Sequence, residues 1–133
     1  MILQSCEQYA SRRSPAVSAR GVAASAQPLA TLAGIDVLRR GGNAADAAVA
    51  VAAALQVTQP CSTGLGGDCF VLYYSAADRQ VRALNGSGRC PAALSLQRLE
   101  REGFRDRLPL DHAYTVTVPG APAAWADVAA TLG

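Results

Sequence analysis

The longest apolar stretch of the chain runs from residue 44 to residue 57, and Asp46 and Gln56 are its only polar members. It contains neither glycine nor proline, and a helix that is apolar nearly all round is typical of a buried position. Asn43 precedes the stretch as a suitable N-cap, and Asp46 adds negative charge to the first turn. At ~1.5 Å per residue such a helix spans roughly 21 Å, too short to cross a bilayer. The pattern therefore predicts the central core helix of a soluble domain.

A second helix is predicted upstream, beginning near Pro28, whose fixed φ suits a first helical position. It ends at the pair Gly41-Gly42, where a glycine suits the left-handed conformation that follows many helices. Arg39 and Arg40 place positive charge in the last turn, where it favours the helix dipole. The apolar positions recur at helical spacing and indicate one apolar face. They are Leu32, Ile35 and Leu38, three residues apart, and Ala33 and Val37, four apart.

Strands are predicted where β-branched and aromatic residues gather. Cys69–Tyr74 and Val81–Asn85 flank a turn over 75–80, which indicates a β-hairpin with a loop longer than two residues. The run Gly21–Ser25 predicts an earlier strand. Tyr114–Val118 alternates between apolar and polar residues and predicts a later one.

Two further helices complete the expected elements. The first covers Leu96–Glu102, with Ser95 as its N-cap and Gly103 as its end. The second runs from about Pro122 to Leu132 and carries Trp125 on its apolar side.

Length and composition narrow the class of protein. A chain of 133 residues suggests one domain at most. Half of the residues are hydrophobic but only 5% are aromatic, so the core must consist of alanine, valine and leucine packed closely. The net charge of +2 is scattered, with no basic run and no interleaved aromatic residues, which disfavours nucleic acid as a partner.

The cysteine pattern favours free thiols. Cys6, Cys61, Cys69 and Cys90 form no CxxC pair, and the chain has a single histidine, so no metal site is expected. Residues 1–14 are polar and irregular and lack the apolar segment of a signal peptide. We therefore expect an irregular N-terminal tail over 1–14 and a location in the reducing cytoplasm, without export or membrane attachment.

Three features invite a chemical interpretation, and none carries one alone. The loop Gly64-Leu65-Gly66-Gly67-Asp68 follows a helix and precedes a strand, whereas a nucleotide-binding loop precedes a helix. Its glycines are explained as well by a tight turn. Ser87 lies between two glycines but not in a GxSxG strand–turn–helix motif. His112, the single imidazole, lies in a polar linker and is expected at the surface.

Four segments taken together resemble the γ-glutamyltranspeptidase (glutathione hydrolase) family. They are GVAASAQPLA over 21–30, AGIDVLRRGGNAADAA over 33–48, STGLGGD over 62–68 and VPGAPAAW over 118–125. They occur in the family's order, without large gaps, and resemble the start of its large subunit. The resemblance covers residues 15–133.

The resemblance implies an incomplete α+β domain, the N-terminal portion of the four-layer αββα fold of N-terminal-nucleophile hydrolases. In that family the precursor cleaves itself, and the newly exposed N-terminal threonine attacks a γ-glutamyl amide to give an acyl-enzyme. Water or an amine then takes the acyl group, and an oxyanion hole stabilises the tetrahedral species. No cofactor is implied. The implied partners are a small γ-glutamyl substrate such as glutathione and the remainder of the precursor, the small subunit.

The chain departs from the family in its catalytic residues. The family's nucleophile and oxyanion donors come from the small subunit, and none of the threonines of this chain matches the nucleophile motif. We therefore expect no catalytic residue within these residues and no hydrolase activity from this chain alone. A truncated product that only binds or packs stays open as the alternative. In isolation, uncovered sheet edges and helix faces predict poor solubility or partial unfolding.

A second departure concerns substrate binding. Members of the family hold the substrate α-carboxylate with an arginine after the second hairpin strand, and alignment places Ser87 at that position. Arg89 follows two residues later, and a bidentate arginine–carboxylate pair there is chemically sensible. Ser87 and Arg89 are therefore the candidate substrate-binding residues. Two alternatives stay open: Arg89 makes a structural ion pair or lies at the surface, and the enzyme is a related acylase for another acyl group.

Overall fold

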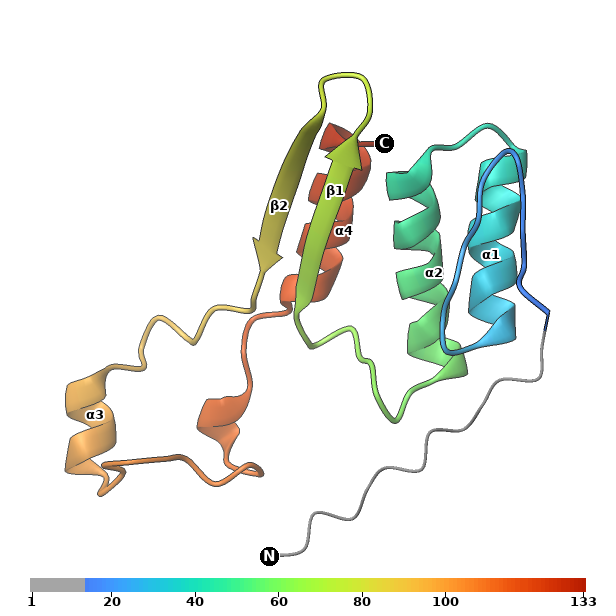
Figure 1. Cartoon of the computed structure of the whole chain (residues 1–133). Helices are drawn as coiled ribbons and strands as arrows, with labels where there is room; N and C mark the ends of the chain where they lie inside the picture. The colour runs from blue at the N-terminus through green and yellow to red at the C-terminus, as the bar shows by residue number, and fades with distance from the viewer. Residues whose placement is uncertain (1–13) are drawn as a thin grey trace, which may run out of the picture.

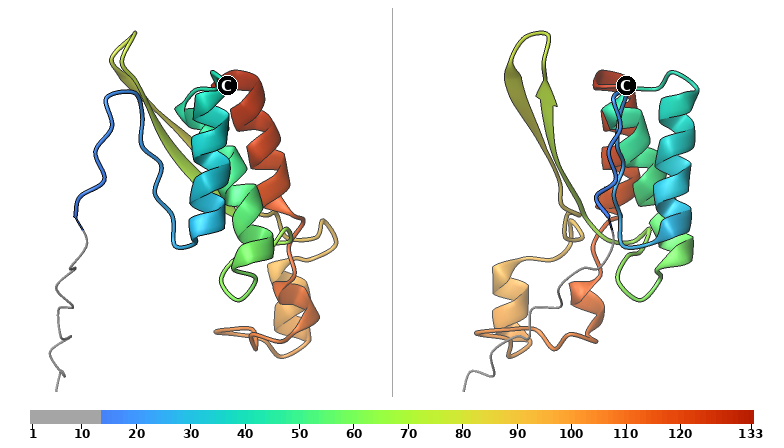
Figure 2. Two further views of the ribbon diagram at one scale, coloured as in Figure 1. Left: turned by 90° about the vertical axis from the view of Figure 1, so that its right-hand side faces the viewer. Right: turned by 45° about the vertical axis from the view of Figure 1, so that its right-hand side comes forward.

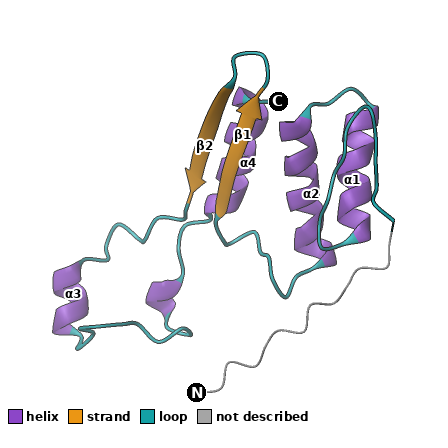
Figure 3. Cartoon of the chain, viewed as in Figure 1, coloured by secondary structure: helices purple, strands orange, loops and turns teal. Residues whose placement is uncertain are grey.

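The structure of the protein is a computed structural model that describes residues 14–133 (Figure 1). The predicted irregular tail over 1–14 lies almost entirely outside these described residues. The described elements, in chain order, are α1 (Pro28–Arg39), α2 (Ala44–Thr58), β1 (Cys69–Ser75), β2 (Gln80–Gly86), α3 (Leu96–Arg101), a 3₁₀ turn (Ala113–Thr115) and α4 (Gly120–Thr131). They combine helices with a two-stranded sheet, so the α+β class is confirmed (Figure 3).

The end of α1 follows the sequence prediction closely. Pro28 occupies the first helical position, and Gly41 adopts a φ of +94° directly after the C-cap Arg40. The amide of Gly42 donates to the carbonyl of Val37 at 3.0 Å, and the amide of Gly41 donates to that of Leu38 at 3.2 Å. These two bonds form a Schellman motif, which satisfies the carbonyls that the helix end leaves free. The chain can then reverse directly into α2.

Asn43 begins α2 and also ties it to the end of α4. Its side-chain oxygen accepts from the amides of Ala45 and Asp46, and the Asp46 carboxylate accepts from the amide of Asn43 at 3.0 Å. This reciprocal pair is a capping box. The side-chain nitrogen of Asn43 donates to the carbonyl of Leu132 at 2.5 Å. One side chain thus fixes where α2 starts and where α4 stops.

Helix α2 lies between α1 and α4 and packs against both (Figures 1 and 2). The fully buried apolar residues of the described chain all lie on these three helices and are small: Ala30, Ala45, Ala47, Ala121, Ala124 and Val128. The predicted core of small aliphatic residues is therefore confirmed. The expected burial of α2 all round is not, since Val57 exposes 82% of its surface and Ala45 and Ala47 are its only fully buried residues.

Strands β1 and β2 form the predicted antiparallel hairpin. Cys69 pairs with Gly86 and Ser75 with Gln80, so residues 76–79 form the loop. One face of the hairpin packs on α4. The other face carries Phe70 and Leu72, which expose 68% and 80% of their surface. The hairpin is therefore covered on one side within the described residues, as the ribbon in Figure 2 shows.

Three sequence-based predictions differ from the structure. Gly21–Ser25 forms no strand and lies instead against the helices. A Cβ added at Gly34 of α1 would be 3.4 Å from the Cβ of Ala23. Tyr114–Val118 forms no strand either: the His112 side chain accepts from the amide of Tyr114 and starts a 3₁₀ turn. Leu32 is 55% exposed, because the helix contact is made through Ala30 and Gly34. The two strand predictions failed because a strand requires a hydrogen-bonded neighbouring strand, which a pattern of residues along one segment does not supply.

Residues 90–116 form an excursion, which includes α3 and extends from the end of the hairpin away from the three packed helices (Figures 1 and 2). The predicted helix after Ser95 is confirmed, because the Ser95 hydroxyl accepts a hydrogen bond from the amide of Arg98. Gly103 follows the helix with a φ of +91°. In the part of the chain that the structure describes, no helix is long and apolar enough to span a membrane.

Candidate functional site

Three segments distant in sequence meet at the base of the hairpin, and we name this meeting point the glycine junction. It comprises residues 67–68 at the end of the glycine loop, residues 86–89 from the last residue of β2 onward, and residues 117–121, which lead into the start of α4. The carbonyl of Gly67 accepts from the amides of Gly120 at 3.1 Å and Ala121 at 2.9 Å. The amide of Val118 donates to the carbonyl of Arg89 at 2.9 Å. Backbone groups therefore cap α4, whose N-cap Pro119 makes no side-chain cap.

Glycine is required at the junction because the backbones approach too closely for a side chain. A Cβ added at Gly86 would lie 2.8 Å from the carbonyl oxygen of Cys69, and one at Gly88 would lie 2.5 Å from that of Val118. A Cβ at Gly120 would lie 2.7 Å from the amide nitrogen of Gly88. These obstacles are backbone atoms, which cannot move aside as a side chain can. The glycines of this region thus serve close packing.

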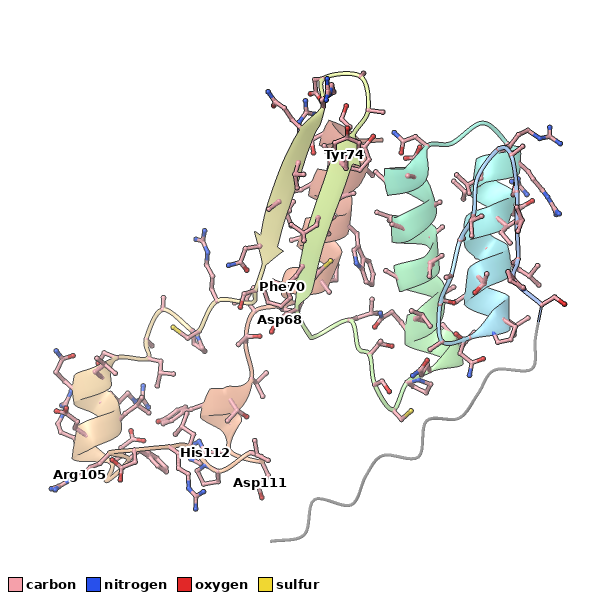
Figure 4. The ribbon with its side chains drawn as sticks, viewed as in Figure 1. Asp68, Phe70, Tyr74, Arg105, Asp111 and His112 are labelled. Atoms are coloured by element: carbon pink, nitrogen blue, oxygen red, sulfur yellow. The ribbon has the colours of Figure 1, made fainter. Side chains whose placement is uncertain are left out.

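Two side chains hold the segment after β2. The carboxylate of Asp68 accepts from the amide of Gly88 at 2.6 Å, and the side-chain oxygen of Asn85 accepts from the amide of Ser87 at 3.0 Å. Asp68 lies directly before β1, at the foot of the hairpin (Figure 4). Neither residue was a candidate from sequence. The position of Asp68, directly after Gly66-Gly67, hinted at a structural role, but its partner lies 20 residues away.

The two residues predicted to bind substrate lie side by side in this held segment. Ser87 and Arg89 flank Gly88, and both are exposed. Within residues 14–133 the Arg89 guanidinium makes no salt bridge, so the alternative of a structural ion pair finds no support there. The side chain is free to meet an anionic group from solvent or from another part of a larger protein.

A cavity of about 250 Å³ adjoins the junction between the end of α2, the glycine loop and α4. Thr63, Asp68 and Trp125 are among the residues that line it. The Thr63 hydroxyl donates to the carbonyl of Leu55 at 2.9 Å, which pins the loop to α2. Trp125, predicted on the apolar side of the last helix, is half-buried here beside Leu55. The glycine loop therefore borders a concave surface instead of crossing open solvent.

The hydroxyls of most threonines in the described chain serve local structure. Thr58 and Thr131 donate to carbonyls one helical turn back, at 3.0 and 2.6 Å, and Thr115 donates to the carbonyl of His112 at 2.7 Å. Thr31 donates similarly to the carbonyl of Gln27 at 3.2 Å. A hydroxyl engaged in this way has no base beside it to accept its proton, so these threonines do not form a nucleophile–base pair.

His112 lies in the excursion, away from the junction (Figure 4). Its ring contacts those of Phe104 and Tyr114 edge-on, at centroid distances of 4.8 and 4.7 Å, and it is half-buried, which differs from the expected surface position. The Tyr114 hydroxyl donates to the Glu102 carboxylate at 3.0 Å and, together with Arg98, lowers the pKa of that carboxyl. The imidazole is thus part of a local cluster and does not activate Ser87.

Metal-binding side chains are not grouped in the described residues. No three His, Cys, Asp or Glu side chains between residues 14 and 133 are close enough to hold an ion. Cys61, Cys69 and Cys90 are free thiols there.

Comparison with known proteins gives a consistent result. A sequence model of the γ-glutamyltranspeptidase family matches residues 30–133. The glutathione hydrolase-like YwrD proenzyme of Bacillus subtilis is 42% identical over 110 residues, which are 79% of this chain and 20% of that protein. The glutathione hydrolase proenzyme of Bacillus subtilis is 44% identical over 72 residues, which are 54% of this chain and 12% of that protein. The chain thus spans about a fifth or less of these two relatives.

Solved structures agree. A cephalosporin acylase from Bacillus halodurans superposes with a TM-score of 0.83 and 43% identity, over 98% of this chain and 24% of the acylase chain. The γ-glutamyltranspeptidase of Helicobacter pylori superposes with a TM-score of 0.73 and 31% identity, over 84% of this chain and 32% of that chain. The arrangement of helices, hairpin and junction is therefore one that occurs within larger hydrolases.

Proposed function

Because the chain belongs to the γ-glutamyltranspeptidase family, we propose that it forms the N-terminal part of the large subunit of an enzyme that cleaves γ-glutamyl amides through an acyl-enzyme. The observation that carries this proposal is the family match over residues 30–133, which includes every segment of the glycine junction. The junction supports the proposal structurally, because its hydrogen bonds hold the backbone that carries the exposed Ser87 and Arg89.

In this proposal residues 87–89 bind the α-carboxylate of the acyl donor. The Arg89 guanidinium offers two parallel N–H donors to the carboxylate, and the Ser87 hydroxyl offers a third. Both residues are exposed, and Asp68, which holds the Gly88 amide between them, lines the 250 Å³ cavity. The bound carboxylate would fix one end of the donor, so that its γ-carbonyl reaches a nucleophile supplied by the rest of the enzyme.

The nucleophile is proposed to lie outside residues 1–133, as an N-terminal threonine that the precursor exposes by cleaving itself. Its amino group takes the hydroxyl proton while the oxygen attacks the γ-carbonyl, and the amine of the amide leaves with a proton. Water, or the amine of an acceptor, then releases the glutamyl group. Glutathione is the proposed natural donor, because similar proteins of Bacillus subtilis are a glutathione hydrolase and a glutathione hydrolase-like proenzyme.

Uncovered apolar surfaces support a partner subunit. The outer face of the hairpin exposes Phe70 and Leu72, and the end of α2 exposes Val57. Packed layers cover such faces in complete domains. We propose that the remainder of the precursor, including the small subunit, packs there.

A second candidate is a related acylase that accepts another acyl group. Two observations favour it: Ser87 stands where the resemblance expects the carboxylate-binding arginine, and the similar Bacillus halodurans protein is a cephalosporin acylase. Loss of that arginine weakens the demand for a carboxylate on the donor. The two candidates share the nucleophile and differ in the group that residues 87–89 recognise.

The test is to read the coding sequence beyond Gly133, express the whole precursor and assay three anilides. γ-Glutamyl anilide carries both the carboxylate and the amino group, glutaryl anilide lacks the amino group, and butyryl anilide lacks both. Self-cleavage and a preference for the γ-glutamyl compound are expected. Preference for glutaryl or butyryl anilide would establish the acylase instead, and a precursor that cleaves none of them would contradict both candidates.

Arg89→Ala in the same precursor tests the residue assignment. Loss of a bidentate charged pair is expected to raise the KM for γ-glutamyl anilide about tenfold or more, with kcat less affected. Arg105→Ala, an exposed arginine of the excursion, is the matched control and is expected to leave KM unchanged. An unmoved KM in Arg89→Ala would remove Arg89 from the binding site.

A further inference from the structure

We propose that Asp68 is a positioning residue for substrate binding: its carboxylate holds the Gly88 amide and thereby sets the place of Arg89 and Ser87. This inference rests on the proposed function, since it gives the segment 87–89 its role. It adds a residue that contacts no substrate and acts through the backbone of its neighbour.

Asp68 is itself held on both sides. Before it, the Gly67 carbonyl accepts from the amides of Gly120 and Ala121, which fixes the loop to the start of α4. After it, Cys69 enters β1 and pairs with Gly86 on β2. The carboxylate therefore projects from a backbone that two different elements fix. A hydrogen bond to such a fixed carboxylate therefore fixes the position of the donating amide.

The segment it holds has few other attachments. The amide of Ser87 donates to Asn85, a neighbour on the same strand, and the carbonyl of Arg89 accepts from Val118. Among the hydrogen bonds of residues 14–133, Asp68 is the one side chain of another element that holds residues 86–90. Gly88 has no side chain of its own to anchor it. Without Asp68, residues 87–89 are joined to another element by a single hydrogen bond, from the amide of Val118 to the carbonyl of Arg89.

The bond is short and charge-assisted, at 2.6 Å between the carboxylate oxygen and the Gly88 nitrogen. Charge-assisted bonds are about twice as strong as neutral ones. The carboxylate is also an exposed negative charge whose hydrogen-bond partner, Gly88, directly precedes Arg89, so a plain electrostatic role is the competing explanation. An asparagine separates the two, because it keeps the acceptor oxygen and removes the charge.

Kinetics in the whole precursor are the first part of the test. Asp68→Ala is expected to raise the KM for γ-glutamyl anilide about tenfold while kcat changes by less than about twofold. Asp68→Asn is expected to restore KM to within about threefold of the parent. Asp106→Ala, an exposed aspartate of the excursion, is the control and is expected to leave both constants unchanged. Equal defects in the alanine and asparagine variants would assign the effect to charge and overturn the proposal.

Amide hydrogen exchange at Gly88 is the second part and does not depend on activity. The Gly88 amide is expected to exchange slowly in the parent and in Asp68→Asn, and at least about tenfold faster in Asp68→Ala. Unchanged exchange in Asp68→Ala would overturn the inference. If exchange responds as expected but the parent hydrolyses no γ-glutamyl anilide, the hold of Asp68 on Gly88 stands and the proposed function fails. If Asp68→Ala does not fold, an unprotected Gly88 amide in the folded parent would overturn the inference by itself.

Discussion

The helical body and the excursion are stabilised in opposite ways. In the body, which comprises α1, α2, the hairpin and α4, the buried residues are alanines, one valine and two glycines, and backbones approach one another through glycines. In the excursion, residues 90–116, no residue is fully buried, and long side chains make the contacts. Arg98 pairs with Glu102 at 3.0 Å and lies over the Tyr114 ring at 5.3 Å.

The difference indicates where substitutions matter. At Gly86, Gly88 and Gly120 of the body a single added methyl group meets backbone atoms, so the position of the hairpin relative to α4 depends on residues that have no side chain. In the excursion a whole side chain can be removed and water can replace it, because exposed ion pairs contribute little. The candidate site belongs to the body side of this division, at the glycine junction where the two regions join.

The largest effect is expected from Gly120→Ala. The added Cβ would lie 2.7 Å from the Gly88 nitrogen and overlap the carbonyl oxygen of Gly86, so β2 and α4 must separate. We expect a loss of about 3 kcal/mol or more in the free energy of unfolding, measured by urea denaturation. Gly64→Ala is the matched control, because a Cβ there has no atom within 4 Å. Equal stability of the two variants would show that the junction is not closely packed.

Gly34→Ala tests the contact between α1 and α2. Its Cβ would lie 2.5 Å from a methyl group of Val51, a side chain that can partly yield. A loss of about 2 kcal/mol is therefore expected. The double variant Gly34→Ala/Val51→Ala should recover part of it, since the second change makes room for the first. Strictly additive losses would mean that the two residues do not meet.

Removing one N-cap side chain from each region compares the stability of the two regions directly. Asn43→Ala removes the α2 cap and the bond to Leu132, and about 1–2 kcal/mol of unfolding free energy should be lost. Ser95→Ala removes the same kind of cap from α3 in the excursion, where global stability should change by less than about 0.5 kcal/mol. The comparison fails if the serine variant is the less stable of the two in thermal melting.

The smallest effect is expected when the pH is lowered and the carboxylate of Glu102 in the excursion is protonated. The Tyr114 hydroxyl and then Arg98 lower the pKa of Glu102 below its ordinary value of 4.5. Because the folded pKa is the lower one, the contribution is complete above pH 4.5 and is lost as the pH falls through the folded pKa. Tyr114 ring resonances should therefore broaden or shift as the pH falls below 4.5 and through the lowered pKa of Glu102. Glu102→Gln should abolish that step, and a step that persists in this variant would contradict the assignment.

Local signals in the sequence predicted what local interactions determine. The N-cap at Asn43, the left-handed Gly41 and the hairpin depend on neighbouring residues, and all three are confirmed. The strands over Gly21–Ser25 and Tyr114–Val118 were wrong because a strand depends on a partner elsewhere in the chain. Trp125 was correctly placed on the apolar side of its helix, whereas Leu32 was not, since small residues made the contact with α2.

The candidate site shows the same limit. Ser87 and Arg89 were found by resemblance, and the structure adds that both are exposed. Asp68 was missed because its partner Gly88 is brought near only when the hairpin closes and α4 docks on Gly67. No pattern of neighbouring residues encodes such a bond. The glycines at 86, 88 and 120 were visible, but their mutual contact was not.

Residues 1–133 are proposed to supply a substrate-binding surface but no nucleophile. The most direct measurement is the hydrolysis of γ-glutamyl anilide by the purified 133-residue chain, beside the self-cleaved precursor at equal concentration. No release of aniline by the chain alone and steady release by the precursor are predicted. Turnover by the 133-residue chain itself would contradict the claim.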